Sequence, residues 1–319
     1  SLVITFAVWV LVATGRIQYW HLLVSASLLG MVNTLDMPLR QALVVELVGH
    51  EDLVNAIALN SLTFNAARLI GPSIAGLVMG SLGVSACFLI NSISFGAVLF
   101  SLIFIHPVAC AVPESRERMG VIESIKEGLR YIVQNEDLFG TMLFIAVVSI
   151  FAFNFGVSVP VFATQILGLE ETGYGFLMSA VGAGAFLGAL LVASLSKSGP
   201  RRLILSVFPA AAGVVLIVIG YMSGFASTSI ALALGGFLCV TYLSTANSNI
   251  QVQTEDRFRG RVMSVYSLIV AGSSPIGNLF VGAADNWFGA RMGFIACGVA
   301  ILVLIVPIFL FISLRHERG

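Results

Sequence analysis

The sequence predicts an all-α integral membrane protein, and three observations carry that prediction. Hydrophobic residues make up 58% of the 319 residues, charged residues only 10%, and the mean hydropathy is +1.01. A soluble globular domain carries about 25% charged residues. The apolar residues also gather in runs long enough to cross a bilayer, and the basic residues concentrate in alternate loops between those runs. With zero net charge and few, dispersed charges, the chain offers no basic face for nucleic acid.

Nine apolar runs reach the length of about 17 to 25 residues that a spanning helix needs. They lie at roughly 21–39, 53–80, 83–105, 139–163, 173–196, 202–222, 228–250, 262–284 and 291–314. A shorter run, 1–14, has no basic segment before it and no small-residue cleavage site after it. It is therefore interpreted as the second half of a helix rather than a signal peptide. About ten spans are expected.

The orientation of the spans follows from the basic residues, because loops rich in Lys and Arg stay in the cytoplasm. Thirteen of the 16 lie in alternate loops and the C-terminal tail: Arg40, Arg116, Arg118, Lys126, Arg130, Lys197, Arg201, Arg202, Arg257, Arg259, Arg261, Arg315 and Arg318. The opposite loops hold Arg16 and Arg291, and Arg68 lies within a span. The sequence thus predicts a multi-pass protein of the plasma (inner) membrane with a cytoplasmic C-terminus.

A polar stretch divides the spans into two groups. Its second part places Ile122, Ile125, Leu129, Ile132 and Val133 on one helical face, the pattern of an amphipathic surface helix. We therefore expect an incomplete N-terminal helical half at 1–105, a cytoplasmic linker at 106–138 and a six-helix half at 139–319.

A weak internal repeat crosses the linker. The residues Glu51-Asp52, Ser61-Leu62, Gly71-Pro72, Gly76 and Gly83 are echoed by Glu255-Asp256, Ser267-Leu268, Pro275, Gly277, Gly282 and Gly289. Both copies run from the cytoplasm outward, so the repeat is parallel. Three spans precede the second copy but only one incomplete span precedes the first. By the repeat alone, two helices and part of a third are expected upstream of Ser1, in a protein of two six-helix halves.

Three segments carry a resemblance to a known family: Met37-Pro-Leu-Arg40-Gln-Ala, Asn65-Ala-Ala-Arg68-Leu-Ile-Gly71-Pro72, and Arg259-Gly-Arg261-Val-Met-Ser264. Together they resemble the major facilitator superfamily, and most closely its branch of macrolide and siderophore exporters. The resemblance covers the chain from helix three of twelve to its end. It implies the major facilitator fold, with two pseudo-symmetric helical halves. It also implies secondary transport. The spans hold no nucleophile with its base, no metal-ligand spacing and no paired carboxylates, so no enzymatic activity, cofactor or metal is expected.

The family's antiporter motif on helix five corresponds to the run from Gly71 to Gly76. Small or helix-bending residues recur here at every fourth position, namely Pro72, Gly76 and Gly80, which leaves a flat strip on one face. Helix eight of the family is the expected partner, and it carries Ala180, Gly184 and Gly188 at the same interval. In the family's loop motif after helix eight, this chain has Lys197, Gly199, Arg201 and Arg202 but no acid.

The candidate transport pathway is built from polar residues inside the spans. Arg68 is the strongest candidate, because an arginine near a bilayer centre costs roughly 2.5 to 3.5 kcal/mol on insertion scales and so usually has a partner. The alternative is a structural arginine bonded to carbonyls freed by Pro72. Further candidates are Asn65, Asn154, Tyr242, Thr245 and Asn249. Asparagines in membrane helices more often bond neighbouring helices.

Charged residues near the cytoplasmic ends form a candidate gate: Asp36, Arg40, Arg201, Arg202, Arg259 and Arg261. Asp36 and Arg40 lie one turn apart, as an ion pair requires, although a purely interfacial pair fits equally. Asp285 lies near the outer end of its span and is interpreted as structural. No acid lies near mid-membrane in the visible spans, so a coupling acid is expected in the missing helices.

These residues predict a proton-coupled exporter of an amphiphilic small molecule, such as a drug, macrolide or siderophore, working by alternating access. The expected partners are the substrate, protons and the lipid bilayer, with the protein a monomer. A lysolipid or lipid transporter of the same fold is the first alternative, because an apolar lining would serve either ligand. A non-transporting truncated remnant is the second.

Overall fold

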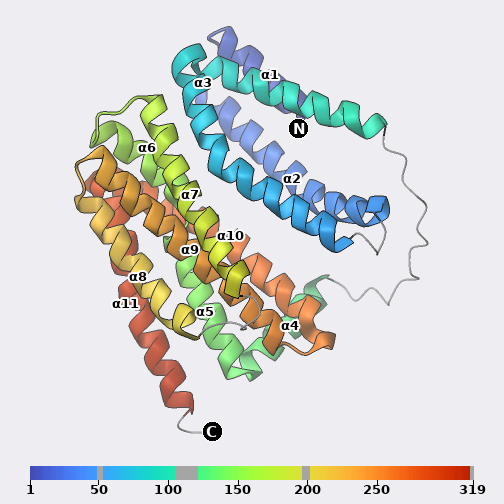
Figure 1. Ribbon diagram of the computed structural model, residues 1–319, viewed down its shortest axis with the longest axis vertical. Coiled ribbons are helices and arrows are strands. Elements are labelled where there is room, and N and C mark those ends of the chain that lie inside the picture. The colour runs from blue at the N-terminus through green and yellow to red at the C-terminus, as the bar shows by residue number, and fades with distance from the viewer. Residues whose placement is uncertain (49–52, 105–120, 196–201, 317–319) are drawn as a thin grey trace. The chain divides into compact units, whose positions relative to one another are not determined.

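The computed structural model describes residues 1–48, 53–104, 121–195 and 202–316, and within these ranges every regular element is a helix (Figure 1). The helices divide between two compact units. The first unit contains Ser1–Ala67 and Ser73–Arg116, and the second contains Arg68–Pro72 and Glu117–Gly319. The prediction of an all-α protein is confirmed for the described chain.

Three helices form most of the first unit: α1 (Leu2–Ala13), α2 (Tyr19–Val48) and α3 (Leu53–Ile103). α3 is a helical hairpin rather than one rod. It turns at Gly83, whose φ of 80° and ψ of 168° are open to glycine and strained for other residues. The Cys87 thiol on the second limb donates to the Ala75 carbonyl on the first, at 3.8 Å. The predicted runs 53–80 and 83–105 are these two limbs.

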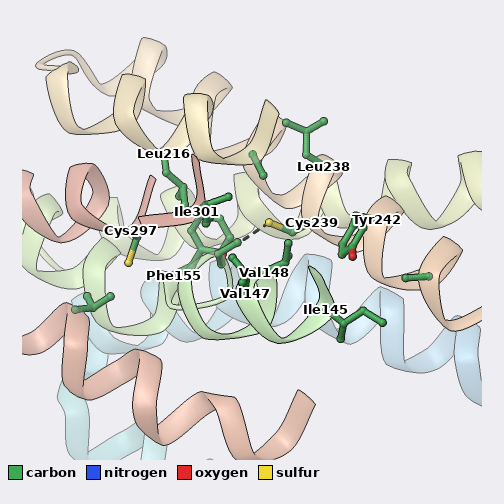
Figure 2. Close-up of a cluster of buried hydrophobic side chains, with 14 of the residues drawn as sticks. Ile145, Val147, Val148, Phe155, Leu216, Leu238, Cys239, Tyr242, Cys297 and Ile301 are labelled. Atoms are coloured by element: carbon green, nitrogen blue, oxygen red, sulfur yellow. Dashed lines mark hydrogen bonds between the residues drawn. The ribbon is translucent and has the colours of Figure 1, made fainter. Parts of the chain in front are cut away.

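Eight helices form the second unit. They are α4 (Val121–Gln134), α5 (Glu136–Phe151), α6 (Phe155–Gln165), α7 (Glu171–Leu195), α8 (Arg202–Tyr221), α9 (Phe225–Gln253), α10 (Asp256–Phe288) and α11 (Ala290–His316). Their buried core gathers around Phe155 and Ile301, with Leu216, Cys239 and Tyr242 beside them (Figure 2). The buried side chains of this core come from all eight helices of the second unit, which fixes the bundle.

The run predicted as a single helix at 139–163 is two helices, α5 and α6, separated at Ala152–Asn154. Two side-chain bonds stabilise the break. The Asn154 Nδ2 donates to the Ile150 carbonyl at 2.6 Å, and the Cys239 thiol of α9 donates to the Ala152 carbonyl at 3.7 Å. Hydropathy does not register this break, because the apolar composition continues across it.

Seven helical segments in the described ranges are long and apolar enough to cross a membrane: Ser81–Ile103, Glu136–Gln165, Thr172–Leu195, Leu203–Tyr221, Phe225–Gln253, Arg257–Phe288 and Ala290–Ile308. Shorter apolar helices lie at Leu2–Ala13 and Tyr19–Val32. The predicted run at 83–105 and the six runs after the linker therefore coincide with helical segments of spanning length, one of which, Glu136–Gln165, is interrupted at Ala152–Asn154.

Candidate functional site

A cavity of about 370 Å³ opens in the second unit between α5, α9 and α10. α5 contributes one serine, the α5–α6 break contributes an aromatic and an amide side chain, and α9 and α10 each contribute a serine and at least one apolar side chain. The lining residues are Ser149, Phe153, Asn154, Val240, Leu243, Ser244, Val270 and Ser274. A largely apolar wall with a few polar groups is the usual composition of a small-molecule site. The polar groups are all neutral, so this wall suits hydroxyl, amide and apolar parts of a ligand.

Ser149 is the polar group of the cavity that most needs a partner. Its side chain is 4% exposed, and its hydroxyl has no hydrogen-bond partner among the described residues. Leaving a buried polar group unsatisfied costs about 1 to 3 kcal/mol. A ligand or water that reached this hydroxyl would recover that energy.

Asn154, one of the predicted pathway residues, lies where α5 gives way to α6 and lines the cavity. α10 approaches this point closely, because a side-chain carbon at Gly277 would collide with the Ile150 carbonyl and lie 2.6 Å from Asn154 Oδ1. Glycine at 277 is therefore required for this helix contact. The asparagine amide is fixed by its own helix and faces the cavity at the same time.

The three polar residues predicted on α9 do not line this cavity. Tyr242 is 1% exposed in the hydrophobic core (Figure 2), and Thr245 is buried with its hydroxyl donating to the Thr241 carbonyl at 2.8 Å. Asn249 is partly exposed nearer the end of the helix. The cavity face of α9 is instead formed by Val240, Leu243 and Ser244.

The internal repeat pairs Arg68, in the sequence alignment, with a residue that lines this cavity. Aligning Gly83 with Gly289 also pairs Ser61 with Ser267, Gly71 with Gly277 and Gly76 with Gly282, without a gap. The two aligned turn glycines share one unusual backbone conformation, with φ and ψ of 80° and 168° at Gly83 and 90° and 160° at Gly289. The same alignment pairs Arg68 with Ser274, which lines the cavity. The repeat is thus the sequence signal that would have found Ser274.

Comparison with known proteins agrees with this architecture. The family model described as "Transmembrane secretion effector" matches residues 1–318. The chain belongs to this family of major facilitator transporters.

Three relatives show how the match extends beyond the family model. The staphyloferrin A transporter of Staphylococcus aureus is 22% identical over 92% of this chain and 72% of its own length. An MFS-type transporter of Bacillus subtilis, YfmI, is 25% identical over 88% of this chain and 70% of its own. The multidrug efflux pump Tap of Mycobacterium tuberculosis is 25% identical over 75% of this chain and 57% of its own. The expected superfamily is confirmed, and the relatives are transporters rather than enzymes.

The small residues of α7, the helix expected to correspond to helix eight of the family, pack against α9 at two of the three predicted positions. A side-chain carbon at Gly184 would collide with the Ala233 carbonyl of α9, and one at Gly188 would lie 2.7 Å from the Phe237 carbonyl. Gly236 of α9 returns the contact against α7 at Val181. Gly184 and Gly188 therefore serve a close helix crossing within the second unit. This corrects the prediction that they form the face for the 53–80 helix.

The linker helix α4 docks on the beginning of α10, where the predicted gate arginine Arg261 lies. Arg261 Nη1 pairs with Glu127 Oε2 of α4 at 2.5 Å, and the ring of Tyr131 stacks on Phe258 with centroids 4.4 Å apart. A side-chain carbon at Gly128 would lie 2.7 Å from the Arg261 carbonyl, so the two backbones are nearly in contact. In the described structure Arg261 thus joins the linker to α10. Arg259 beside it is exposed and also interacts.

Several predicted residues lie outside the described part of the structure. Arg201 is one, and for seven others the helix is described but the side chain is not: Arg40, Asn65, Arg68, Pro72, Gly76, Gly80 and Arg202. Gly71 lies within the first limb of α3, Asp36 is partly exposed on α2, and Ala180 is half-buried on α7. The roles of these residues in transport stay predictions.

Proposed function

We propose that this chain is a secondary transporter that exports an amphiphilic small molecule across the plasma membrane by alternating access. The observation that carries the proposal is the cavity between α5, α9 and α10, with its apolar wall and the unpartnered Ser149 hydroxyl. Such a wall holds an apolar body and hydrogen-bonds a few neutral groups. A relative named as a multidrug efflux pump supports export, and one named as a staphyloferrin A transporter supports a small-molecule substrate.

We assign Arg68 to the same pathway because the repeat pairs it with Ser274 of the cavity. An arginine at the position that the repeat pairs with Ser274 would bind an anionic or acceptor group of the substrate. Basic residues concentrate in alternate loops and in the C-terminal tail, which supports a cytoplasmic C-terminus. Exchange of the substrate for protons is the coupling that we propose.

The cavity is tested by changing Ser149 to Ala and measuring equilibrium binding of radiolabelled erythromycin to the purified protein. Loss of one neutral hydrogen bond of about 0.5 to 1.5 kcal/mol should weaken binding by about 2- to 10-fold. Thermal stability should stay equal or rise, because the variant removes an unsatisfied buried hydroxyl. A merely structural serine would lower the thermal stability on substitution and leave erythromycin binding unchanged.

The matched control is Ser229→Ala, on α9 but outside the cavity, where the hydroxyl donates to the Phe225 carbonyl at 2.8 Å. It should bind erythromycin like the wild type. Wild-type protein in vesicles should also move erythromycin or ethidium under an imposed pH gradient. Equal binding by Ser149→Ala and the wild type would remove Ser149 from the site, and absence of any transport by the wild type would overturn the proposed function.

A further inference from the structure

Asp285 is a buried acid that the cavity does not use. It lies on α10, one turn before the corner that leads into α11, and it is 8% exposed. One carboxylate oxygen, Oδ1, accepts a hydrogen bond from the Gly293 backbone N–H of α11 at 3.0 Å. The other, Oδ2, has no hydrogen-bond partner in the part of the chain that the structure describes. An ionisable side chain inside a spanning helix is costly and is by default a functional candidate.

The surroundings of Asp285 provide no counter-ion among the described residues. α11 packs against the carboxyl group so closely that a side-chain carbon at Gly293 would collide with it. The charged group on this stretch of α11, Arg291, directs its guanidinium to α8, donating to Gly220 O at 2.8 Å and Met222 O at 3.1 Å. The other titratable neighbour is the buried Cys297 thiol. Beside the corner lies an apolar hollow lined by residues such as Phe288 and Met292.

The corner itself does not require an acid at this position. The corner at Gly83 has nearly the same φ and ψ as the one at Gly289, and the residue aligned with Asp285 there is Met79. The residue aligned with Gly293 is Cys87, so the first corner also lacks the close approach that the carboxyl group makes in the second. The carboxyl group is therefore an addition to a corner that forms without it.

A line of polar groups runs from Asp285 toward the cavity. Cys297, one turn beyond Gly293, lies near Asp285 and shares a small internal space with Asn154. Asn154, Ser158, Gly293 and Cys297 line a small internal space of about 10 Å³, close to the minimum that holds one water. Asn154 also lines the large cavity. Asp285 thus connects to the substrate cavity through two side chains and room for a water molecule.

We propose that Asp285 is a proton-binding site of this transporter, linked to the cavity through Cys297 and Asn154. In the loaded form the Oδ2 atom bonds a proton taken from water, and the carboxyl group is neutral. On release the O–H bond breaks, the proton returns to water, and the carboxylate keeps its bond from the Gly293 N–H. Substrate that contacts Asn154 would alter the surroundings of Cys297 and so favour release of the proton from Asp285. This inference rests on the proposed function for its role in coupling, but the proton site can be tested without transport.

The first test uses infrared spectroscopy on the purified protein during acidification. The wild type should develop a protonated-carboxyl band that is missing from Asp285→Asn, which keeps the oxygen that accepts from Gly293. The exposed neighbour provides the control, Asn286→Ala, whose band should match the wild type. An identical titration of the wild type and Asp285→Asn would overturn the proposal whether or not the protein transports.

The second test measures ethidium movement in vesicles. Asp285→Asn should lose accumulation driven by a pH gradient while keeping exchange of ethidium across the membrane without a gradient. If Asp285 served only to accept the hydrogen bond from the Gly293 N–H, asparagine would preserve that bond. Gradient-driven accumulation by Asp285→Asn would then stay at the wild-type level. If the wild type moves no ethidium in either assay, the proposed function fails, and the infrared result still decides whether Asp285 binds a proton.

Discussion

The corner at Gly83 and the corner at Gly289 share one backbone geometry but differ in their fastenings, the side-chain hydrogen bonds that join the neighbouring helices. Both glycines hold a positive φ with an extended ψ, a region that is essentially restricted to glycine. At the second corner, Asp285 binds the Gly293 N–H, and Arg291 binds carbonyls at the end of α8. At the first corner the described contact between the limbs is the weak bond from the Cys87 thiol to the Ala75 carbonyl.

This difference separates what a helical corner needs from what a particular copy adds. The glycine is needed in both copies, because no side chain tolerates that φ and ψ without strain. The charged groups are present in one copy, and each of them reaches a different helix. They are therefore assigned to functions of the second copy, fastening for Arg291 and proton binding for Asp285.

The largest effect is expected from Gly289→Ala. The substitution forces a side chain into a region that costs about 1 to 3 kcal/mol, and it does so in the packed second unit. Thermal unfolding of the purified protein should shift to clearly lower temperature. Gly83→Ala should shift it in the same direction, since the backbone strain is the same.

Gly272→Ala is the matched control for both corners. Gly272 lies in the regular helix α10, and a side-chain carbon there would meet nothing within 4 Å. Alanine should be neutral or slightly stabilising, because glycine costs about 1 kcal/mol in a helix interior. If Gly289→Ala changed the unfolding temperature as little as Gly272→Ala, the corner would not require glycine.

Corner positions could be predicted from the sequence, whereas the fastenings could not. Apolar run lengths located the helices on both sides of Gly83 and Gly289, because a bilayer imposes their length. The interruption at Asn154 and the bonds of Arg291 depend on residues far apart in the chain.

The apolar pattern at 122–133 predicted a helix, and α4 is a helix there. Leu129 and Val133 of the predicted apolar face are nevertheless about half exposed. Ile132 of that face is buried, and Gly128 beside it admits the α10 backbone.

The candidate site was predicted in part for a related reason. Asn154 stood out as an amide in an apolar run, and the cavity includes it. Ser149 and Ser244 did not stand out, because serine is common in membrane helices and readily bonds its own backbone. On α9, the polar spacing that includes Tyr242 and Thr245 follows the buried face. A tyrosine ring fills a core well, and a threonine hydroxyl is satisfied by its own helix.

A smaller effect is expected from Arg291→Ala, which removes the bonds from α11 to the end of α8, including the one to Ser223 Oγ at 2.9 Å. Because the guanidinium is partly exposed, we expect a loss of about 1 to 2 kcal/mol rather than the full value of three charged hydrogen bonds. Thermal unfolding should report it. Arg16→Ala, at an exposed position in the other unit, should change stability by less than about 0.5 kcal/mol.

The smallest effect is expected from Cys87→Ala at the first corner. A thiol is a weak donor, and the Cys87 contact with Ala75 is partly exposed, so the loss should be about 0.5 kcal/mol or less. Cys239→Ala removes a similar thiol bond at a fully packed position, the α5–α6 break, and should cost more because it also leaves a cavity. Thermal unfolding of the two variants ranks them. If Cys87→Ala destabilised the protein more than Cys239→Ala, the first corner would depend on its side-chain hydrogen bond as much as the second does. Glycine geometry alone would then not explain why both corners form.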